Sequence, residues 1–236
     1  MRIKSYYQNA KKRIQNTIRK YRYRGNDVVC LVCDWHGKRF FSGRCPSCDS
    51  LPRTRLISYL LKTLSFDLNK KKVLHVAPNV QEYTILKSKY EMAVYDRINL
   101  IPRKTINLVQ DLTKLDLANE IYDFIINWHV MEHIPEDVKA IKEMYRVLKA
   151  GGELLLSVPI YPIGRELTFE DKDLPVSRYQ EVHGHHDHYR SCGLDYYKRF
   201  ESAGFRTTTI EVGNYNLPEI NRYGLKPGHV AWLFKK

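Results

Sequence analysis

The sequence predicts an α/β protein with an open, mostly parallel sheet, an antiparallel last strand and a small metal-held module before the sheet. After residue 70, short apolar segments alternate with helical patterns, which is typical of a parallel sheet covered by helices on both faces. Four of the five cysteines lie close together near the N-terminus. The length of 236 residues fits one large domain with a small appendage, and 43% apolar and 28% charged residues exclude a disordered or fibrous chain.

The strand and helix assignments follow from apolar runs and helical periodicity. The expected strands lie at about 72–77, 92–96, 106–109, 122–128, 153–158, 205–212 and 229–235. The expected helices of this part lie near 79–89, 136–148 and 193–203. No helical pattern separates the last two strands, so we expect them to pair antiparallel at one end of the sheet.

Residues 1–24 form a basic segment with apolar side chains at helical spacing, which predicts a basic amphipathic helix. The segment holds nine Lys or Arg and no acid, so it accounts for most of the net charge of +13. An anionic partner, either RNA or an anionic membrane surface, fits this asymmetry. The alternative is a helix docked on the main domain with a solvated basic face. No apolar run or leader pattern indicates export, so we expect a cytoplasmic protein, peripheral at the inner membrane face if the helix binds lipid.

Residues 25–66 predict a zinc-ribbon-like module followed by a linking helix at 52–66. Cys30 and Cys33 form one C-x2-C pair, and Cys45 and Cys48 form another eleven residues later. Two such pairs supply the four thiolates that structural zinc prefers, with no position left open for water. The alternatives are four unligated or disulfide-bonded cysteines, and His36 is a weaker substitute ligand.

The segment VLHVAP at 73–78, followed by Asp96 at the expected end of the next strand, matches the strand, loop and helix that bind a nucleotide in a doubly wound sheet. In such a sheet the strand-end carboxylate holds the ribose hydroxyls. The loop lacks the glycines that cradle a pyrophosphate. The residues therefore predict a ligand with a ribose and an adenine but no phosphate.

Several motifs give the chain a specific resemblance. They are VLHVAP, DLTKLD at 111–116, HVMEHIPEDVKAIKEMYRVLKAGG at 129–152 and ESAGF at 201–205. With these, residues 27–236 resemble class I S-adenosylmethionine-dependent methyltransferases. More narrowly, the chain resembles bacterial enzymes with an N-terminal four-cysteine module, whose genes often lie among those for surface polysaccharide assembly. The resemblance implies a Rossmann-like methyltransferase domain over 67–236.

The resemblance also implies the positions that contact S-adenosylmethionine. The first-strand loop would lie against the methionine part, Asp96 would hold the ribose, Asp111 and Leu112 would meet the adenine, and the rest would line the floor. The implied contacts are His75, Val76, Ala77, Pro78, Asp96, Asp111, Leu112, Asn127, Trp128 and His129. Asp111 could instead cap a turn, and His133 could serve only as a helix-start residue.

Methyl transfer from a sulfonium needs a base only when the acceptor carries a proton, which directs attention to histidine. Four of the nine histidines lie in EVHGHHDHYR at 181–190. We predict His188 as the catalytic base, with His129 as second choice. The predicted acceptor contacts are His133, Arg165, Asp187 and Arg190. A solvated loop and a second metal site are the alternatives for this segment.

These features predict a methyltransferase that acts on the oxygen or nitrogen of a polar small molecule or glycan precursor. An RNA methyltransferase that holds RNA with its zinc module and basic arm is the second hypothesis. The third is a catalytically inactive, zinc-containing interaction protein, suggested by the missing glycines. No feature requires an obligate protein partner.

Overall fold

The computed structural model describes residues 14–236, and the chain divides into two compact units. The first unit comprises the residues up to Phe66 together with Gly213–Pro227. The second comprises Asp67–Val212 and Gly228–Lys236. The segment Gly213–Pro227 thus packs with the N-terminal unit, although it lies within the range predicted for the methyltransferase domain.

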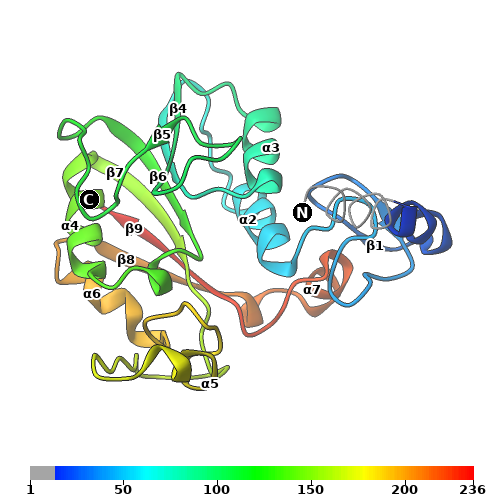
Figure 1. The fold of residues 1–236 in the computed structure, drawn as a ribbon. Coiled ribbons are helices and arrows are strands. Elements are labelled where there is room, and N and C mark those ends of the chain that lie inside the picture. Colours follow the sequence, from blue (N-terminus) through cyan, green and yellow to red (C-terminus); the bar gives the residue numbers. More distant parts are fainter. Residues whose placement is uncertain (1–13) are drawn as a thin grey trace, which may run out of the picture. The chain divides into compact units, whose positions relative to one another are not determined.

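The second unit is built on a seven-stranded sheet (Figure 1). Its strands are β3 (Lys72–Val76), β4 (Val94–Asn99), β5 (Leu108–Val109), β6 (Tyr122–Trp128), β7 (Leu148–Ser157), β8 (Arg206–Glu211) and β9 (Val230–Lys235). They lie in the order β5-β4-β3-β6-β7-β9-β8. The first five are parallel, and β9 runs antiparallel to both β7 and β8. The predicted mostly parallel sheet with an antiparallel last strand is confirmed.

Helices cover both faces of this sheet. Alternate side chains of each strand point to opposite faces, so both faces carry apolar side chains that have to be buried. On one face, Leu74 and Val76 of β3 join the main core together with Ile141 and Met144 of α4 (Asp137–Val147). The short helices η3 (Leu194–Tyr197) and α6 (Lys198–Glu201) add to the same core. Helix α3 (Val80–Lys89) covers the opposite face and begins with Asn79, whose side chain forms a capping box with Glu82.

The structure departs from the predicted elements at several places. Strand β4 runs to Asn99 instead of ending at Asp96, and the predicted helix at 193–203 is split into η3 and α6. A helix, α7 (Leu217–Tyr223), lies between the last two strands, where we expected none. Its signals are local: a proline stands in its first turn and Gly224 ends it with a φ of +59°. Seven residues are too few for apolar periodicity to show.

The first unit contains helical residues 14–22, the antiparallel pair β1 (Arg24–Val29) and β2 (His36–Gly37), and α2 (Pro52–Thr63). The predicted basic helix is described only from residue 14, and its earlier part lies outside the described residues. Ile14, Ile18 and Tyr21 follow one face of this helix and are 59–67% exposed. From residue 14 onward, no helix has the length and apolar character to cross a membrane.

Arg55 holds the first unit together from inside. Its side chain is fully buried and donates hydrogen bonds to four backbone carbonyls, those of Gly43, Ser50, Tyr223 and Gly224, at 2.6–2.9 Å. Its guanidinium also lies 3.9 Å from the centre of the Phe40 ring. Glycine is required at Gly224, since a Cβ there would lie 2.3 Å from Phe40. One side chain therefore links the cysteine loops to the end of α7.

We expect Arg55→Lys to lower the free energy of unfolding by about 2–4 kcal/mol, because a single ammonium cannot reach four carbonyls and leaves some buried without a donor. Arg222→Lys, at an exposed position of the same unit, is the matched control. Urea unfolding followed by circular dichroism measures both. Equal midpoints for the two variants would contradict this role of Arg55.

Candidate cofactor and acceptor site

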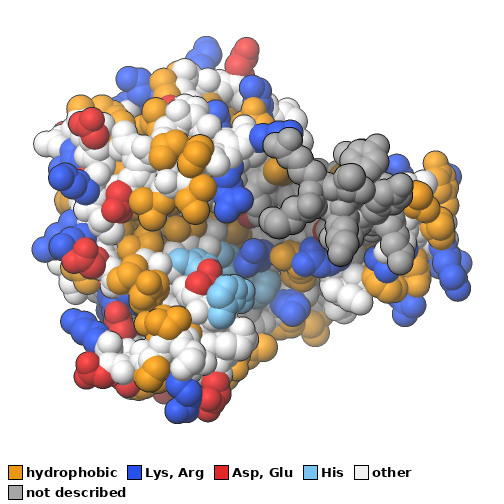
Figure 2. Space-filling model, in the orientation of Figure 1, with side chains coloured by type: hydrophobic (Ala, Val, Ile, Leu, Met, Phe, Trp, Pro, Cys, Tyr) orange, Lys and Arg blue, Asp and Glu red, His pale blue; other side chains and the backbone are white. Residues whose placement is uncertain are grey.

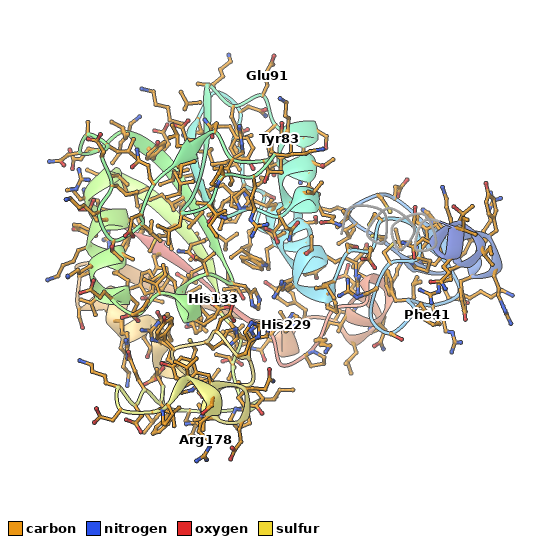
Figure 3. The ribbon with its side chains drawn as sticks, viewed as in Figure 1. Phe41, Tyr83, Glu91, His133, Arg178 and His229 are labelled. Atoms are coloured by element: carbon orange, nitrogen blue, oxygen red, sulfur yellow. The ribbon has the colours of Figure 1, made fainter. Side chains whose placement is uncertain are left out.

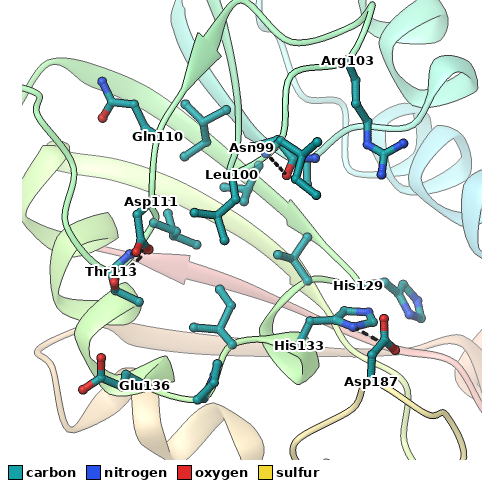
Figure 4. A pocket seen from close by; sticks show the side chains of 18 residues that line it. Asn99, Leu100, Arg103, Gln110, Asp111, Thr113, His129, His133, Glu136 and Asp187 are labelled. Atoms are coloured by element: carbon teal, nitrogen blue, oxygen red, sulfur yellow. Dashed lines mark hydrogen bonds and ion pairs between the residues drawn. The ribbon is translucent and has the colours of Figure 1, made fainter.

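A cavity of about 610 Å³ opens at the carboxyl ends of β3, β4 and β6, where the strand order reverses (Figure 4). This is the crevice in which open α/β sheets bind ligands, and the volume suits a ligand of cofactor size. The wall is formed by Val76, Ala77, Ile98, Asn99, Leu100, Ile101, Arg103, Gln110, Asp111, Leu112, Thr113, His129, Val130, His133, Ile134, Pro135, Glu136 and Asp187.

Two residues of the wall adopt a left-handed backbone conformation although neither is glycine. Ala77 follows β3 with a φ of +47°, and His129 follows β6 with a φ of +55°. The Ala77 N–H donates to the carbonyl of Ile98, and the His129 N–H donates to that of Ser157. Such a conformation costs about 1–2 kcal/mol and is typical of functional sites. Ala77 thus provides the turn that a glycine would otherwise supply, with only a methyl group to accommodate.

The predicted ribose contact, Asp96, does not line the cavity. It lies in the middle of β4, where its carboxylate accepts hydrogen bonds from Asn107 Nδ2 at 2.9 Å and Tyr122 Oη at 2.8 Å. Because β4 continues three residues further than expected, Asn99 stands at the strand end and on the cavity wall. Its Oδ1 accepts a hydrogen bond from the N–H of Ile101.

Near Asn99 the wall carries apolar as well as polar side chains. Leu100 and Ile101 are 66% and 58% exposed, and the buried Leu112 also lines the cavity. The Oδ1 atom of Asp111 accepts hydrogen bonds from the N–H and hydroxyl of Thr113, both at 2.8 Å. Asp111 therefore caps a turn, as one interpretation of the sequence expected. It also lines the cavity wall, where the other interpretation placed it beside the adenine.

Four other predicted cofactor contacts, His75, Pro78, Asn127 and Trp128, are not part of the wall. His75 is fully buried and its Nδ1 pairs with the Tyr95 hydroxyl at 2.9 Å. Burial and the nearby Arg97 lower the pKa of His75 to about 3, so its ring is neutral. The Nδ2 of Asn127 donates to the sulfur of Met131. His75 points to the face of β3 opposite that of Val76, and Asn127 is held among the buried side chains of Met131 and Met144.

Histidines and an acid form the other end of the cavity. His129, His133 and Asp187 line it, and His133 Nδ1 lies 3.3 Å from Asp187 Oδ1 (Figure 4). His188 is not on the wall, but its ring packs at right angles to that of His133, with centroids 4.7 Å apart. Burial lowers the pKa of His188. Figure 2 shows the histidines as one patch around an acidic side chain.

His229 also belongs to this histidine group, although the sequence analysis did not select it. It precedes β9, and its ring centroid is 6.4 Å from that of His129; Figure 3 labels both His229 and His133. A lone histidine before a strand is not part of any motif, so it could be assigned to the site only after the order of the strands in the sheet was known. Asn99 was missed for a related reason, because the extent of β4 was misjudged.

Arg190, predicted to bind the acceptor, is instead a buried structural residue. Its guanidinium donates to the carbonyls of Met131, Ile134 and Pro135 at 2.6–2.9 Å and pairs with the Glu170 carboxylate at 3.1 Å. It therefore fixes the segment that forms one wall of the cavity. Arg165 likewise donates to backbone carbonyls of its own loop and does not line the cavity.

The four predicted zinc ligands come together in the first unit. The sulfurs of Cys30, Cys33, Cys45 and Cys48 all lie within 4.8 Å of one another. The Cys30–Cys48 and Cys33–Cys45 pairs are 3.7 Å apart. The backbone turn between Cys30 and Asp34 and the similar turn between Cys45 and Asp49 present each pair from one loop.

Residues 62–156 match the family model of a methyltransferase domain. No curated protein matches the sequence significantly. Among solved structures, an S-adenosylmethionine-dependent methyltransferase from Mesorhizobium loti has a TM-score of 0.55 at 12% identity, covering 76% of this chain and 97% of its own. A methyltransferase from Archaeoglobus fulgidus has a TM-score of 0.54 at 14% identity, covering 78% and 94%. The [4+2]-cyclase SpnF has the same TM-score at 17% identity, covering 78% and 80%.

The structural similarities establish the fold, and the family match spans β3 to β6 and most of β7, which carry much of the cavity wall. Residues 62–156 therefore match a methyltransferase domain, in a chain whose fold is that of S-adenosylmethionine-dependent methyltransferases. The predicted enzyme class is confirmed at this general level.

The pairing of Glu170 predicts a specific pH dependence of stability. Burial raises the pKa of Glu170, but hydrogen bonds from Arg190 and Arg199 outweigh burial and leave it below the usual 4.5. The ionised group therefore stabilises the fold above about pH 4.5, and this contribution is lost as the pH falls through the lowered pKa. We expect Glu170→Gln to cost about 1–2 kcal/mol at pH 7 and to flatten the acid limb.

Chemical unfolding at a series of pH values from 3 to 7 measures this difference. Glu166→Gln, four residues away and exposed, is the control and should follow the unmodified protein. Parallel pH profiles for Glu170→Gln and the unmodified protein would show that the carboxylate does not contribute.

Proposed function

We propose that this enzyme methylates a polar small molecule or glycan precursor, with S-adenosylmethionine in the cavity and the acceptor at its histidine-lined end. The observation that carries this proposal is that His129, His133 and Asp187 lie together at one end of the cavity (Figure 4). Imidazoles and carboxylates recognise hydroxyl and amine groups of a neutral or weakly charged acceptor by hydrogen bonds.

The donor would be held by residues at the ends of β3, β4 and β5. Asn99 takes the ribose position at the strand end, where its amide can pair with the diol. Leu100, Ile101 and Leu112 provide apolar contact for the adenine ring, with Asp111 at its edge. The small side chain of Ala77 lets the methionine part approach the backbone. This arrangement needs no phosphate-binding glycines, in keeping with a ligand that carries no phosphate.

The transfer itself requires alignment of the methyl group with the acceptor and removal of a proton from the acceptor. Of the two predicted bases, His129 is the better placed, because it lines the cavity whereas His188 does not. Its Nδ1 lies 3.7 Å from Glu132 Oε1. His133 and Asp187 would bind the acceptor.

We also propose that the four cysteines bind a structural zinc ion. A zinc–sulfur distance of about 2.3 Å in a tetrahedron places the sulfurs about 3.8 Å apart, close to the 3.7 Å of the two closest pairs. Cys30 and Cys45 are fully buried, so free thiolates there would be costly without a cation. All four positions come from the chain, which leaves none for catalysis.

The donor assignment predicts that Asn99→Ala weakens S-adenosylmethionine binding at least about tenfold, since it removes the ribose contact. Asn99→Asp should retain the affinity, because a carboxylate accepts from both ribose hydroxyls. Asp96→Asn should change the affinity less than about twofold. Calorimetric titration measures all three. A large loss in Asp96→Asn with none in Asn99→Ala would restore Asp96 as the ribose ligand.

The zinc proposal predicts that Cys45→Ser loses one equivalent of zinc per chain and unfolds at lower temperature, because the coordination supports the fold of its unit. Cys192→Ser, at a buried cysteine outside the cluster, is the control and should keep its zinc. Metal analysis by mass spectrometry gives the content. Equal zinc in both variants would exclude the cysteine site.

A further inference from the structure

A second group of potential metal ligands lies next to the cavity, in the methyltransferase unit and apart from the cysteines. Glu132, His133 and His188 offer ligand atoms that lie within 4.8 Å of one another, and so do His185, Asp187 and His188. The segment 185–188 packs against Glu132 and His133, since the N–H of the next residue, Tyr189, donates to the carbonyl of Glu132 at 2.9 Å. The fold thus brings residues about 55 positions apart to one point.

Glu132 is the unusual member of this group. Its side chain is 1% exposed, and its Oε2 is buried without a hydrogen-bond partner. The other oxygen, Oε1, lies 3.7 Å from His129 Nδ1 and 3.8 Å from His133 Nε2, beyond hydrogen-bond distance. A buried carboxylate is costly unless it is paired or coordinates a cation. Glu132 is therefore a buried carboxylate with one oxygen near two imidazoles and the other without a hydrogen-bond partner.

Both histidines are oriented by an oxygen near their Nδ1 atom. His188 Nδ1 lies 3.3 Å from the carbonyl of His183, and His133 Nδ1 pairs with Asp187 Oδ1 at 3.3 Å. When Nδ1 carries the proton, the Nε2 lone pair of each ring is available as a ligand. Such a contact to a carbonyl or carboxylate is the usual support for a metal-ligating histidine.

We propose that Glu132, His133 and His188 bind one divalent transition-metal ion at the acceptor end of the cavity. Two imidazoles and one carboxylate suit ions such as Zn²⁺, Mn²⁺ or Co²⁺ and leave coordination positions open. His133 lines the cavity, so these positions are available to an acceptor oxygen. Asp187 is a positioning residue that orients His133.

The chemical use of this ion depends on the proposed function, whereas the binding of the ion does not. A coordinated acceptor hydroxyl has a lowered pKa and a fixed orientation. Its oxygen then forms the new bond to the methyl carbon while the carbon–sulfur bond breaks and its electron pair returns to sulfur. The hydroxyl proton passes to His129. The products are the methylated acceptor and S-adenosylhomocysteine, so no oxidant or further reactant is needed.

The test is a Co²⁺ titration of the full chain, prepared with one zinc per chain after mild chelation and followed by visible absorption. We expect one equivalent of Co²⁺ to bind with d–d bands and without a thiolate charge-transfer band, which would report the cysteines. Glu132→Gln and His188→Asn should each weaken this binding at least about tenfold. His186→Asn, an exposed histidine of the same segment in neither ligand set, is the matched control.

Thermal unfolding and S-adenosylmethionine titration of each variant show whether the fold is retained. If it is, Co²⁺ affinity equal to that of the unmodified protein in both ligand variants would overturn the proposal, as would uptake with a thiolate band alone. Binding of S-adenosylmethionine without Co²⁺ uptake would contradict the metal site but not the proposed function. Co²⁺ uptake by a protein that does not bind S-adenosylmethionine would support the metal site and contradict the proposed function.

Discussion

The buried guanidinium of Arg190 is the interaction on which the geometry of the cavity depends. It satisfies three carbonyls in the stretch after β6 and two carboxylates nearby, Glu170 and Asp137. Arg199 and the Tyr196 hydroxyl complete the pairing of Asp137. An irregular stretch of backbone can stay buried only when its polar groups are paired. This network therefore holds the wall residues 133–136 without help from a regular helix or strand.

The parts of the fold that could be predicted from the sequence are those that a local pattern marks, whereas tertiary pairing of polar groups leaves no such pattern. Strand β6 is buried on both faces, so its apolar run YDFIINW marks its limits, and the prediction matches Tyr122–Trp128. Strand β4 carries Asp96 and Arg97, whose charges suggest a strand end. In the structure these charges are satisfied by neighbouring groups, as Arg97 donates to the carbonyls of Tyr95 and Thr105. Such pairing is tertiary and leaves no local pattern.

The sequence predicted the types of residue in the candidate site better than it predicted which individual side chains line the cavity. The histidine segment and the HVMEH motif were recognised, and His129, His133 and Asp187 do share one cavity. His75 and Asn127 were assigned to the cavity from the resemblance alone, and the structure shows that both side chains are buried against protein groups, those of Tyr95 and Met131. Arg190 was assigned to the acceptor with the rest of the histidine segment, and only its burial reveals its structural role.

Arg55 carries a further implication for the order in which the chain folds. Two of its four carbonyl partners, those of Tyr223 and Gly224, lie almost 170 residues further along the sequence. On the ribosome they emerge long after the cysteine loops, and after nearly all of the sheet. The amino-terminal unit, although synthesised first, is therefore completed among the last. Until then the guanidinium has to remain hydrated, so we expect this unit to stay accessible to solvent and to proteases for most of translation.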